Sequence, residues 1–308
     1  MLRGRSLHRV SLSPLGAPVE RRGPRGSANG SGHLVNTQEI RSSKRASGAR
    51  PLVMITAYDV AGAHFADQAG VDILLVGDSL ANVVLGHRDT LHVTLDDMVR
   101  HVGAVSAASP KAHVVADLPW PTYHEGPDAA VRAAVALVRA GAQSVKLEGG
   151  AKRAEVVSAI LDAEIPVMGH LGLTPQSVLA MGGYRVQARS PEAAQLLLDD
   201  AHALQELGAY SLVLEGVPSS VGAQVTAALE IPTIGIGAGP DTDGQVLVFH
   251  DVLGLSLATP AKFVRRYADL GAIMTDAVAR FADDVRSGSF PAPEESYGAL
   301  STPSSSAQ

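Results

Sequence analysis

Acidic residues stand at the ends of three successive apolar runs in the first half of the chain. Asp78, Asp117 and Glu148 each follow a short stretch of aliphatic side chains. In a parallel barrel the carboxyl ends of the strands meet on one face, so these carboxylates would lie together and repel unless a cation neutralises them. The chain has no cysteine, and oxygen ligands without thiolates favour Mg²⁺ over zinc. We interpret the three acids as one Mg²⁺ site, although each alone could instead cap the helix that follows.

Two basic or titratable side chains are expected beside these acids. Lys146 lies two residues before Glu148, so both side chains point to the same face of a strand. An ammonium inside a barrel needs carboxylates or an anionic substrate nearby, which favours a clamp for a substrate carboxylate. The alternative is a structural ion pair with a neighbouring acid. His170 follows the next run and is expected at the same rim in contact with the ligand, or else as a hydrogen-bonded core histidine.

A fourth acid, Glu215, ends a later apolar run outside the three-acid group. A carboxylate free of metal in a dry pocket is a candidate general base, because burial raises its pKa towards working pH. The alternative is a salt bridge to Lys146 or to an arginine. Together these groups indicate a metal-bound 2-oxo acid, a polarised carbonyl and a base that forms an enolate.

The elements that must position these residues are short β-rich runs alternating with helical segments. Most of the runs are continuously apolar, as expected for parallel strands buried on both faces. They comprise residues 52–56, 72–76, 113–116, 144–147, 165–168, 210–214, 231–235 and 246–249. Alanine-rich segments between them are helical in character, and those at 128–140 and 191–207 end at Gly141 and Gly208, as helix C-termini prefer. Eight such units over roughly 240 residues predict an α/β fold, the (β/α)8 TIM barrel.

The alternative fold is a doubly wound open sheet. The glycine-rich segment 235–239 might suggest a dinucleotide loop, but it lacks the G-x-G-x-x-G spacing and follows the seventh run rather than the first. We therefore do not interpret it as a nucleotide-binding fingerprint.

Charge and composition divide the 308-residue chain. Its net charge is −6, which argues against a nucleic-acid platform, and no apolar run approaches the roughly 20 residues that cross a bilayer. Residues 1–50 carry ten basic and two acidic side chains with many Ser, Gly and Pro. We predict a disordered basic arm at 1–49, a catalytic domain at 50–297 and a disordered polar tail at 298–308. An organellar transit peptide or a misassigned start are the alternatives for the arm.

Several sequence blocks, in the same order, resemble those of the ketopantoate hydroxymethyltransferase family. They are Met54–Asp59, Leu75–Ser79, Ala116–Pro119, Val145–Gly150, Gly169–Ser177, Gly182–Gln187, Gly235–Gly239 and Asp243–Gln245. The resemblance covers about residues 50–297, and so many ordered blocks are far more specific than any single motif.

The resemblance implies a (β/α)8 barrel of the phosphoenolpyruvate/pyruvate-binding type in a cytoplasmic homo-oligomer, often a decamer, without nucleic-acid or membrane partners. It implies transfer of a hydroxymethyl group from methylenetetrahydrofolate to 3-methyl-2-oxobutanoate, giving 2-dehydropantoate and tetrahydrofolate in pantothenate biosynthesis. The family's site residues fall on one Mg²⁺ site (Asp78, Asp117, Glu148), on oxo acid contacts (Asp78, Ser79, Asp117, Lys146, with His170 lining the pocket) and on a proton acceptor (Glu215).

The chain departs from the family's usual pattern at three places. Glu294-Glu-Ser-Tyr297 stands where Glu-His-Ser-Phe is usual, Ala188 replaces a glycine, and Leu85 replaces a polar or aromatic residue.

Two rival functions are a carbon–carbon lyase of the same barrel superfamily, which typically carries a loop cysteine, and a non-catalytic metabolite-binding barrel. Near the C-terminus, Phe281, Val285 and Phe290 are expected to pack against another subunit.

Overall fold

The computed structural model describes residues 34–298, within which eight parallel strands form a closed barrel in sequence order. The predicted barrel is confirmed and the open-sheet alternative is wrong. The strands are β1 (Leu52–Thr56), β2 (Ile73–Val76), β3 (His113–Asp117), β4 (Ser144–Glu148), β5 (Val167–Gly172), β6 (Ser211–Glu215), β7 (Thr233–Ile236) and β8 (Gly244–Leu247).

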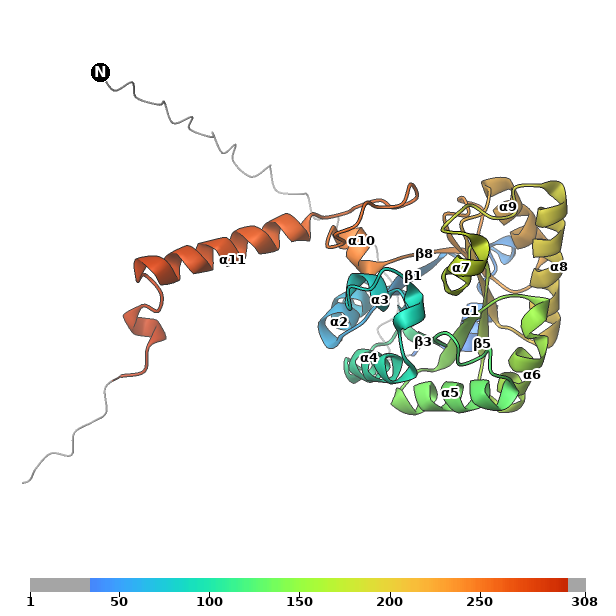
Figure 1. Ribbon diagram of the computed structural model, residues 1–308, viewed down its shortest axis with the longest axis horizontal. Coiled ribbons are helices and arrows are strands. Elements are labelled where there is room, and N and C mark those ends of the chain that lie inside the picture. The colour runs from blue at the N-terminus through green and yellow to red at the C-terminus, as the bar shows by residue number, and fades with distance from the viewer. Residues whose placement is uncertain (1–33, 299–308) are drawn as a thin grey trace, which may run out of the picture. The chain divides into compact units, whose positions relative to one another are not determined.

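Most of the helices lie between successive strands and surround the barrel (Figure 1). The helices of the described residues are α1 (Thr37–Arg41), α2 (Val60–Gln68), α3 (Leu80–Val83), α4 (Leu95–Ala107), α5 (Pro127–Ala140), α6 (Ala154–Asp162), α7 (Val178–Met181), α8 (Pro191–Leu207), α9 (Ser219–Ala228), α10 (Phe249–Leu253) and α11 (Leu270–Ser287). Helices α5 and α8 end at Gly141 and Gly208, whose φ angles of 117° and 109° lie in the left-handed region, as their sequence predicted.

The apolar residues of the strands separate into two buried layers. One set, which includes Met54, Leu75 and Met168, fills the inside of the barrel. The other set, which includes Leu74 and Leu212, packs against the surrounding helices. Because both faces of each strand are covered, the strands read as continuous apolar runs rather than as alternating patterns.

Glycines set the limits of two strands that the sequence placed differently. Residues 165–168 and 246–249 were predicted as strands, whereas β5 runs on to Gly172 and β8 begins at Gly244. A Cβ on Gly169 would lie 2.8 Å from a Leu204 methyl, and one on Gly244 would lie 2.7 Å from the Leu52 carbonyl oxygen. Glycine is required at these two strand positions because neighbouring segments of the chain approach them closely. Since glycine otherwise disfavours strands, a prediction from residue propensity places the strand ends at the glycines instead.

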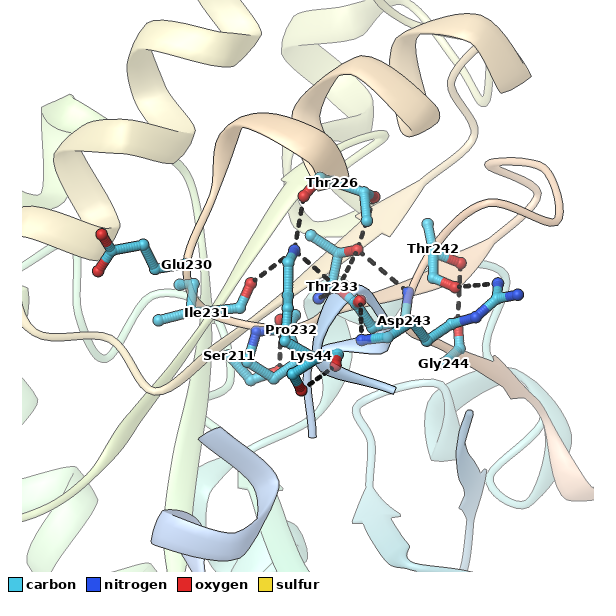
Figure 2. Close-up of polar contacts among 12 residues, drawn as sticks. Lys44, Ser211, Thr226, Glu230, Ile231, Pro232, Thr233, Thr242, Asp243 and Gly244 are labelled. Carbon is cyan, nitrogen blue, oxygen red and sulfur yellow. Dashed lines mark hydrogen bonds and ion pairs between the residues drawn. The ribbon is translucent and has the colours of Figure 1, made fainter. Parts of the chain in front are cut away.

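The predicted boundary of the basic arm at residue 49 is wrong, because residues 34–49 contain ordered structure. Asn36 caps α1 through a capping box with Glu39, and Ile40 is fully buried. The Lys44 ammonium donates to the carbonyl oxygens of Thr226 and Ile231 at 2.6 and 3.2 Å and pairs with the Asp243 carboxylate at 2.9 Å (Figure 2). Residues 1–33 and 299–308, where the remainder of the predicted arm and tail falls, lie outside the described residues.

Helix α11 differs from the other long helices because none of its residues is buried. Met274, Val278, Phe281 and Val285 repeat at helical spacing and are each about half exposed or more. The Phe281 ring packs edge-on against Phe290, with ring centroids 5.4 Å apart. Within residues 34–298, no helix is long and apolar enough to cross a membrane.

A buried histidine makes the stability of the barrel depend on pH. His113 on β3 is 1% exposed, and its Nε2 lies 2.8 Å from the Ser144 hydroxyl, which in turn lies 2.8 Å from the Tyr210 hydroxyl. Burial lowers the pKa of His113 to about 4, whereas an unfolded chain binds the proton near pH 6.5. Between these two pH values the unfolded state holds more protons, so stability falls as the pH falls.

We therefore expect His113 to cost about 2 kcal/mol of unfolding free energy between pH 7 and pH 5. In His113→Gln, which keeps a hydrogen-bonding group at this position, that part of the pH dependence should disappear. Urea unfolding at both pH values measures it, with His64→Gln, at an exposed position, as the control. An unchanged pH dependence in His113→Gln would contradict the assignment.

Candidate active site

A cavity of about 200 Å³ opens among the carboxyl ends of the strands. All seven residues that the sequence singled out line this cavity together: Asp78, Ser79, Asp117, Lys146, Glu148, His170 and Glu215. Asp78 and Ser79 follow β2, Asp117 ends β3, Glu148 ends β4 and Glu215 ends β6. These side chains are up to 137 residues apart in sequence. They meet because all the parallel strands of the barrel end at the same rim.

The strand register decides which of these side chains meet. Lys146 on β4 pairs in register with Asp117 on β3, and Glu148 pairs with His170 on β5. The Lys146 ammonium lies 2.7 Å from Asp117 Oδ1. The structural ion pair considered for Lys146 is thus present, and it forms on the wall of the cavity.

Burial and like charge dominate the electrostatics of the acid cluster. Asp78, Asp117 and Glu148 are each 5% exposed or less. Desolvation, followed by the charges of Asp117 and Glu148, raises the pKa of Asp78 well above its usual value. Desolvation lowers the pKa of Lys146, but the three carboxylates outweigh it and raise that pKa. The cavity therefore holds more negative charge than Lys146 alone can balance.

His170 connects the acid cluster to Glu215. Its Nδ1 lies 3.5 Å from Glu148 Oε1 and its Nε2 lies 3.2 Å from Glu215 Oε2. Burial and the Lys146 ammonium lower the pKa of His170, but its hydrogen bonds with Glu148 and Glu215 prevail and raise it to about 9. Lys146 Nζ and His170 Nδ1 lie within hydrogen-bond distance, 3.2 Å apart.

Glu215 is the most accessible carboxylate of the group, with a side chain that is 16% exposed. Its ionic partner is His170, rather than Lys146 or an arginine as the sequence alternative proposed. The Ser79 hydroxyl lies 2.9 Å from the hydroxyl of buried Tyr58. Tyr58 thus limits the directions in which the Ser79 hydroxyl can point.

Sequence reasoning assigned no role to two buried residues that contact the acids. The Gln176 side-chain amide donates to Asp78 Oδ2 at 2.8 Å, and its backbone N–H donates to Glu148 Oε2 at 2.9 Å. The Tyr123 hydroxyl donates to Gln176 Oε1 at 2.7 Å. Gln176 lies within one of the blocks used for the family resemblance, which was the available signal, whereas no sequence signal marked Tyr123.

The donor set fits a magnesium ion by its chemistry. Three buried carboxylates face one cavity with uncompensated negative charge, and such oxygen donors suit Mg²⁺. Within residues 34–298, no group of three or more His, Asp or Glu side chains is arranged to hold a metal as it stands. The oxygens have other partners in this arrangement, since Lys146 pairs with Asp117 and Gln176 holds one oxygen each of Asp78 and Glu148.

Solved structures of the same fold include 2,3-dimethylmalate lyase, a member of the PEP mutase/isocitrate lyase superfamily. It aligns with a TM-score of 0.54 and 19% identity, covering 86% of this chain and 92% of that one. Phosphonopyruvate hydrolase aligns with a TM-score of 0.55 and 12% identity, covering 87% and 92% of the two chains. At these identities the similarity establishes the barrel architecture alone.

Sequence relatives are much more similar than these structures. The 3-methyl-2-oxobutanoate hydroxymethyltransferase of Koribacter versatilis is 53% identical over 248 residues, which cover 80% of this chain and 84% of the relative. The enzyme of the same name from Pyrobaculum calidifontis is 54% identical over 255 residues, which cover 83% and 96%. The family model for ketopantoate hydroxymethyltransferase matches residues 34–293. The chain therefore belongs to the ketopantoate hydroxymethyltransferase family.

Proposed function

We propose that this chain transfers a hydroxymethyl group from methylenetetrahydrofolate to 3-methyl-2-oxobutanoate, giving 2-dehydropantoate and tetrahydrofolate in pantothenate biosynthesis. One observation carries the proposal: the three buried acids, Lys146, His170 and Glu215 line a single cavity. The names of the 53–54% identical relatives support the same activity. The carbon–carbon lyase alternative has no comparable support, because the lyase of the same fold is only 19% identical.

The oxo acid is proposed to bind with its carboxylate towards Lys146. This ammonium is buried and lies on the cavity wall, and a buried positive charge attracts an anion strongly where water is excluded. Ser79, with Asp78 and Asp117, borders the same space, and its hydroxyl can donate to a substrate oxygen. His170, whose pKa is raised to about 9, adds positive charge to that wall.

We assign one Mg²⁺ per subunit to Asp78, Asp117 and Glu148. When bound there, the ion would polarise the keto carbonyl and so make the neighbouring C3–H more acidic. The Asp117 carboxylate pairs with the Lys146 ammonium in the structure. To hold the ion as well, this carboxylate would have to interact with both positive charges. The raised pKa of Asp78 also means that a proton and a metal compete for this carboxylate.

Glu215 is proposed to take the proton from C3. Its carboxylate belongs to β6, beyond the acid cluster, and its ionic partner is His170 rather than any of the three proposed metal-holding acids. The C3–H bond breaks, its proton passes to Glu215, and C3 then bonds to the one-carbon unit. Over the whole reaction the folate–carbon bonds break and one water supplies the hydroxyl oxygen. His170 holds the Glu215 carboxylate in one orientation for this step.

The volume of the cavity indicates that the two substrates bind in different places. About 200 Å³ is below the range of roughly 300–1,000 Å³ that is usual for larger ligands. A small oxo acid suits this space, whereas a folate must approach from the mouth. Tyr184, which lines the cavity and is 53% exposed, stands on that approach.

We further propose a cytoplasmic homo-oligomer, a decamer as the family resemblance implies, in which α11 contacts another copy. The apolar stripe at Met274, Val278, Phe281 and Val285 is exposed in the single chain. Burying such a stripe contributes roughly 25 cal/mol for each Å² of apolar surface removed from water. No nucleic-acid or membrane partner is proposed.

The metal assignment predicts that Asp117→Asn loses Mg²⁺-dependent turnover while the barrel stays folded. The amide keeps the size of the side chain but removes one of the three negative charges. Turnover of the oxo acid over a Mg²⁺ titration, with circular dichroism on the same sample, measures both. Asp72→Asn, which removes a buried carboxylate paired with Arg50, is the control and should keep its Mg²⁺ dependence. Full activity of Asp117→Asn at low Mg²⁺ would refute the assignment.

The base assignment predicts that Glu215→Gln slows exchange of the C3 proton by roughly 10²–10⁴-fold. The amide keeps size and polarity, so binding of Mg²⁺ and of the oxo acid should change little. Exchange with deuterated solvent, followed by NMR without folate, isolates this step from one-carbon transfer. Glu206→Gln, at an exposed position of α8, serves as the control. If Glu215→Gln exchanges the proton at the parent rate, Glu215 is not the base and His170 is the next candidate.

The assembly proposal predicts that Phe281→Asp shifts the protein to smaller species in sedimentation velocity. A charge within the apolar stripe would have to be desolvated in the contact. Ala279→Asp adds the same charge on the other side of the helix and should leave the assembly unchanged. A wild-type chain that sediments as a stable monomer at micromolar concentration would contradict the proposal.

A further inference from the structure

We propose that Gln176 is a positioning residue that holds Asp78 and Glu148 in the orientation that receives the metal ion. The inference rests on the metal site of the proposed function and assigns to it a residue that touches neither substrate nor ion. It is carried by hydrogen bonds that join one buried side chain and its backbone to two of the three acids.

Gln176 lies in the loop that follows β5 and contacts the acids at the carboxyl ends of β2 and β4. It lies in a single 3-10 turn, Pro175–Ser177, and is only 6% exposed. Its Nε2 donates to Asp78 Oδ2 at 2.8 Å and to the Leu118 carbonyl oxygen at 3.0 Å. Its backbone N–H donates to Glu148 Oε2 at 2.9 Å. One residue therefore fixes two acids that enter the cavity from different strands.

The orientation of the amide is itself fixed. The Tyr123 hydroxyl, on a side chain 1% exposed, donates to Gln176 Oε1 at 2.7 Å, and that hydroxyl also accepts from the Glu148 backbone N–H at 3.4 Å. A flipped amide would turn its oxygen towards the Asp78 carboxylate, so that two acceptors would face each other, and its NH₂ towards the Tyr123 hydroxyl, whose hydrogen would lose its acceptor. Tyr123 thus ensures that the amide donates to Asp78.

These bonds use one oxygen of each carboxylate. Asp78 Oδ2 and Glu148 Oε2 are bound to Gln176, whereas Oδ1 of Asp78 and Oε1 of Glu148 are not. Asp78 therefore keeps Oδ1 free of Gln176 for a ligand, whereas Glu148 Oε1, also free of Gln176, lies 3.5 Å from His170 Nδ1. This is the arrangement by which outer residues commonly orient metal-binding carboxylates.

The chemistry of an amide suits this position better than that of a cationic side chain. A lysine or arginine would donate equally well but would cancel the negative charge that attracts a divalent cation. The amide donates a hydrogen bond and leaves the charge of both acids intact. A purely structural role, anchoring the loop after β5, would not require the donor to reach an acid of β2.

Mn²⁺ binding without the oxo acid tests the inference, because it requires no turnover. The free Mn²⁺ signal in electron paramagnetic resonance gives the affinity of the wild type, Gln176→Met and Tyr123→Phe. We expect Gln176→Met, which keeps the backbone N–H but loses the amide, to weaken Mn²⁺ binding by roughly 10–100-fold. Tyr123→Phe, which frees the amide to rotate, should weaken it by a smaller factor.

The matched control is Gln205→Met. Gln205 Oε1 accepts from the backbone N–H groups of Glu230 and Ile231 at 2.6 and 3.1 Å, ahead of β7 and away from the cavity. This variant loses comparable hydrogen bonds and should keep wild-type Mn²⁺ affinity, even where its thermal stability falls.

Each outcome decides one question. If the wild type binds no Mn²⁺, the metal site of the proposed function is wrong, whatever Gln176 does. If the wild type binds it and Gln176→Met binds it equally tightly, the inference about Gln176 is overturned. If Gln176→Met does not fold, Tyr123→Phe decides instead, and an unchanged affinity in that variant overturns the inference.

Discussion

The burial of excess negative charge at one end of a closed barrel governs the arrangement of this molecule. Asp78, Asp117 and Glu148 are nearly inaccessible to water, and an isolated buried carboxylate costs far more than any single contact returns. Their neighbours are accordingly donors: the Lys146 ammonium, His170 and the Gln176 amide. Strand register supplies these neighbours, because Asp117 and Lys146, like Glu148 and His170, are paired positions of adjacent strands.

The two ends of the barrel treat buried acids differently. At the amino end, Asp243 pairs with Lys44 and Asp72 pairs with Arg50, so each acid has a full positive charge beside it. At the carboxyl end, the acids around the cavity outnumber the basic groups, and burial together with the charges of Asp117 and Glu148 raises the pKa of Asp78. Paired charges stabilise the structure at the amino end, whereas the charge at the carboxyl end is the basis of the proposed cation site. Buried acids thus contribute to stability at the amino end, and at the carboxyl end they form the proposed metal site.

Those features of the fold and of the site that depend on local pattern and on the common direction of parallel strands could be predicted from the sequence. Continuous apolar runs predicted the barrel, and acids at run ends predicted which side chains would share a cavity. The sequence could not reveal long-range pairing: Lys44 was counted as part of a disordered arm because its partner lies 199 residues away. Glu215 was assigned to the right rim but not to His170, and Gln176 received no role because the sequence block that contains it does not reveal that its amide lies between two acids.

The closure between the first and last strands determines when the barrel can be completed. β1 pairs with β8 through Leu52 and Gly244, and Lys44 binds Asp243 beside that seam. During synthesis, residues 34–56 are therefore made long before their partners emerge from the ribosome. Until then β1 has one unpaired edge, which is a site for mispairing with other chains. The first strand of the barrel keeps one edge unpaired until the last strand has been synthesised, so a nascent chain must keep that edge covered or remain at risk of aggregation for most of its translation.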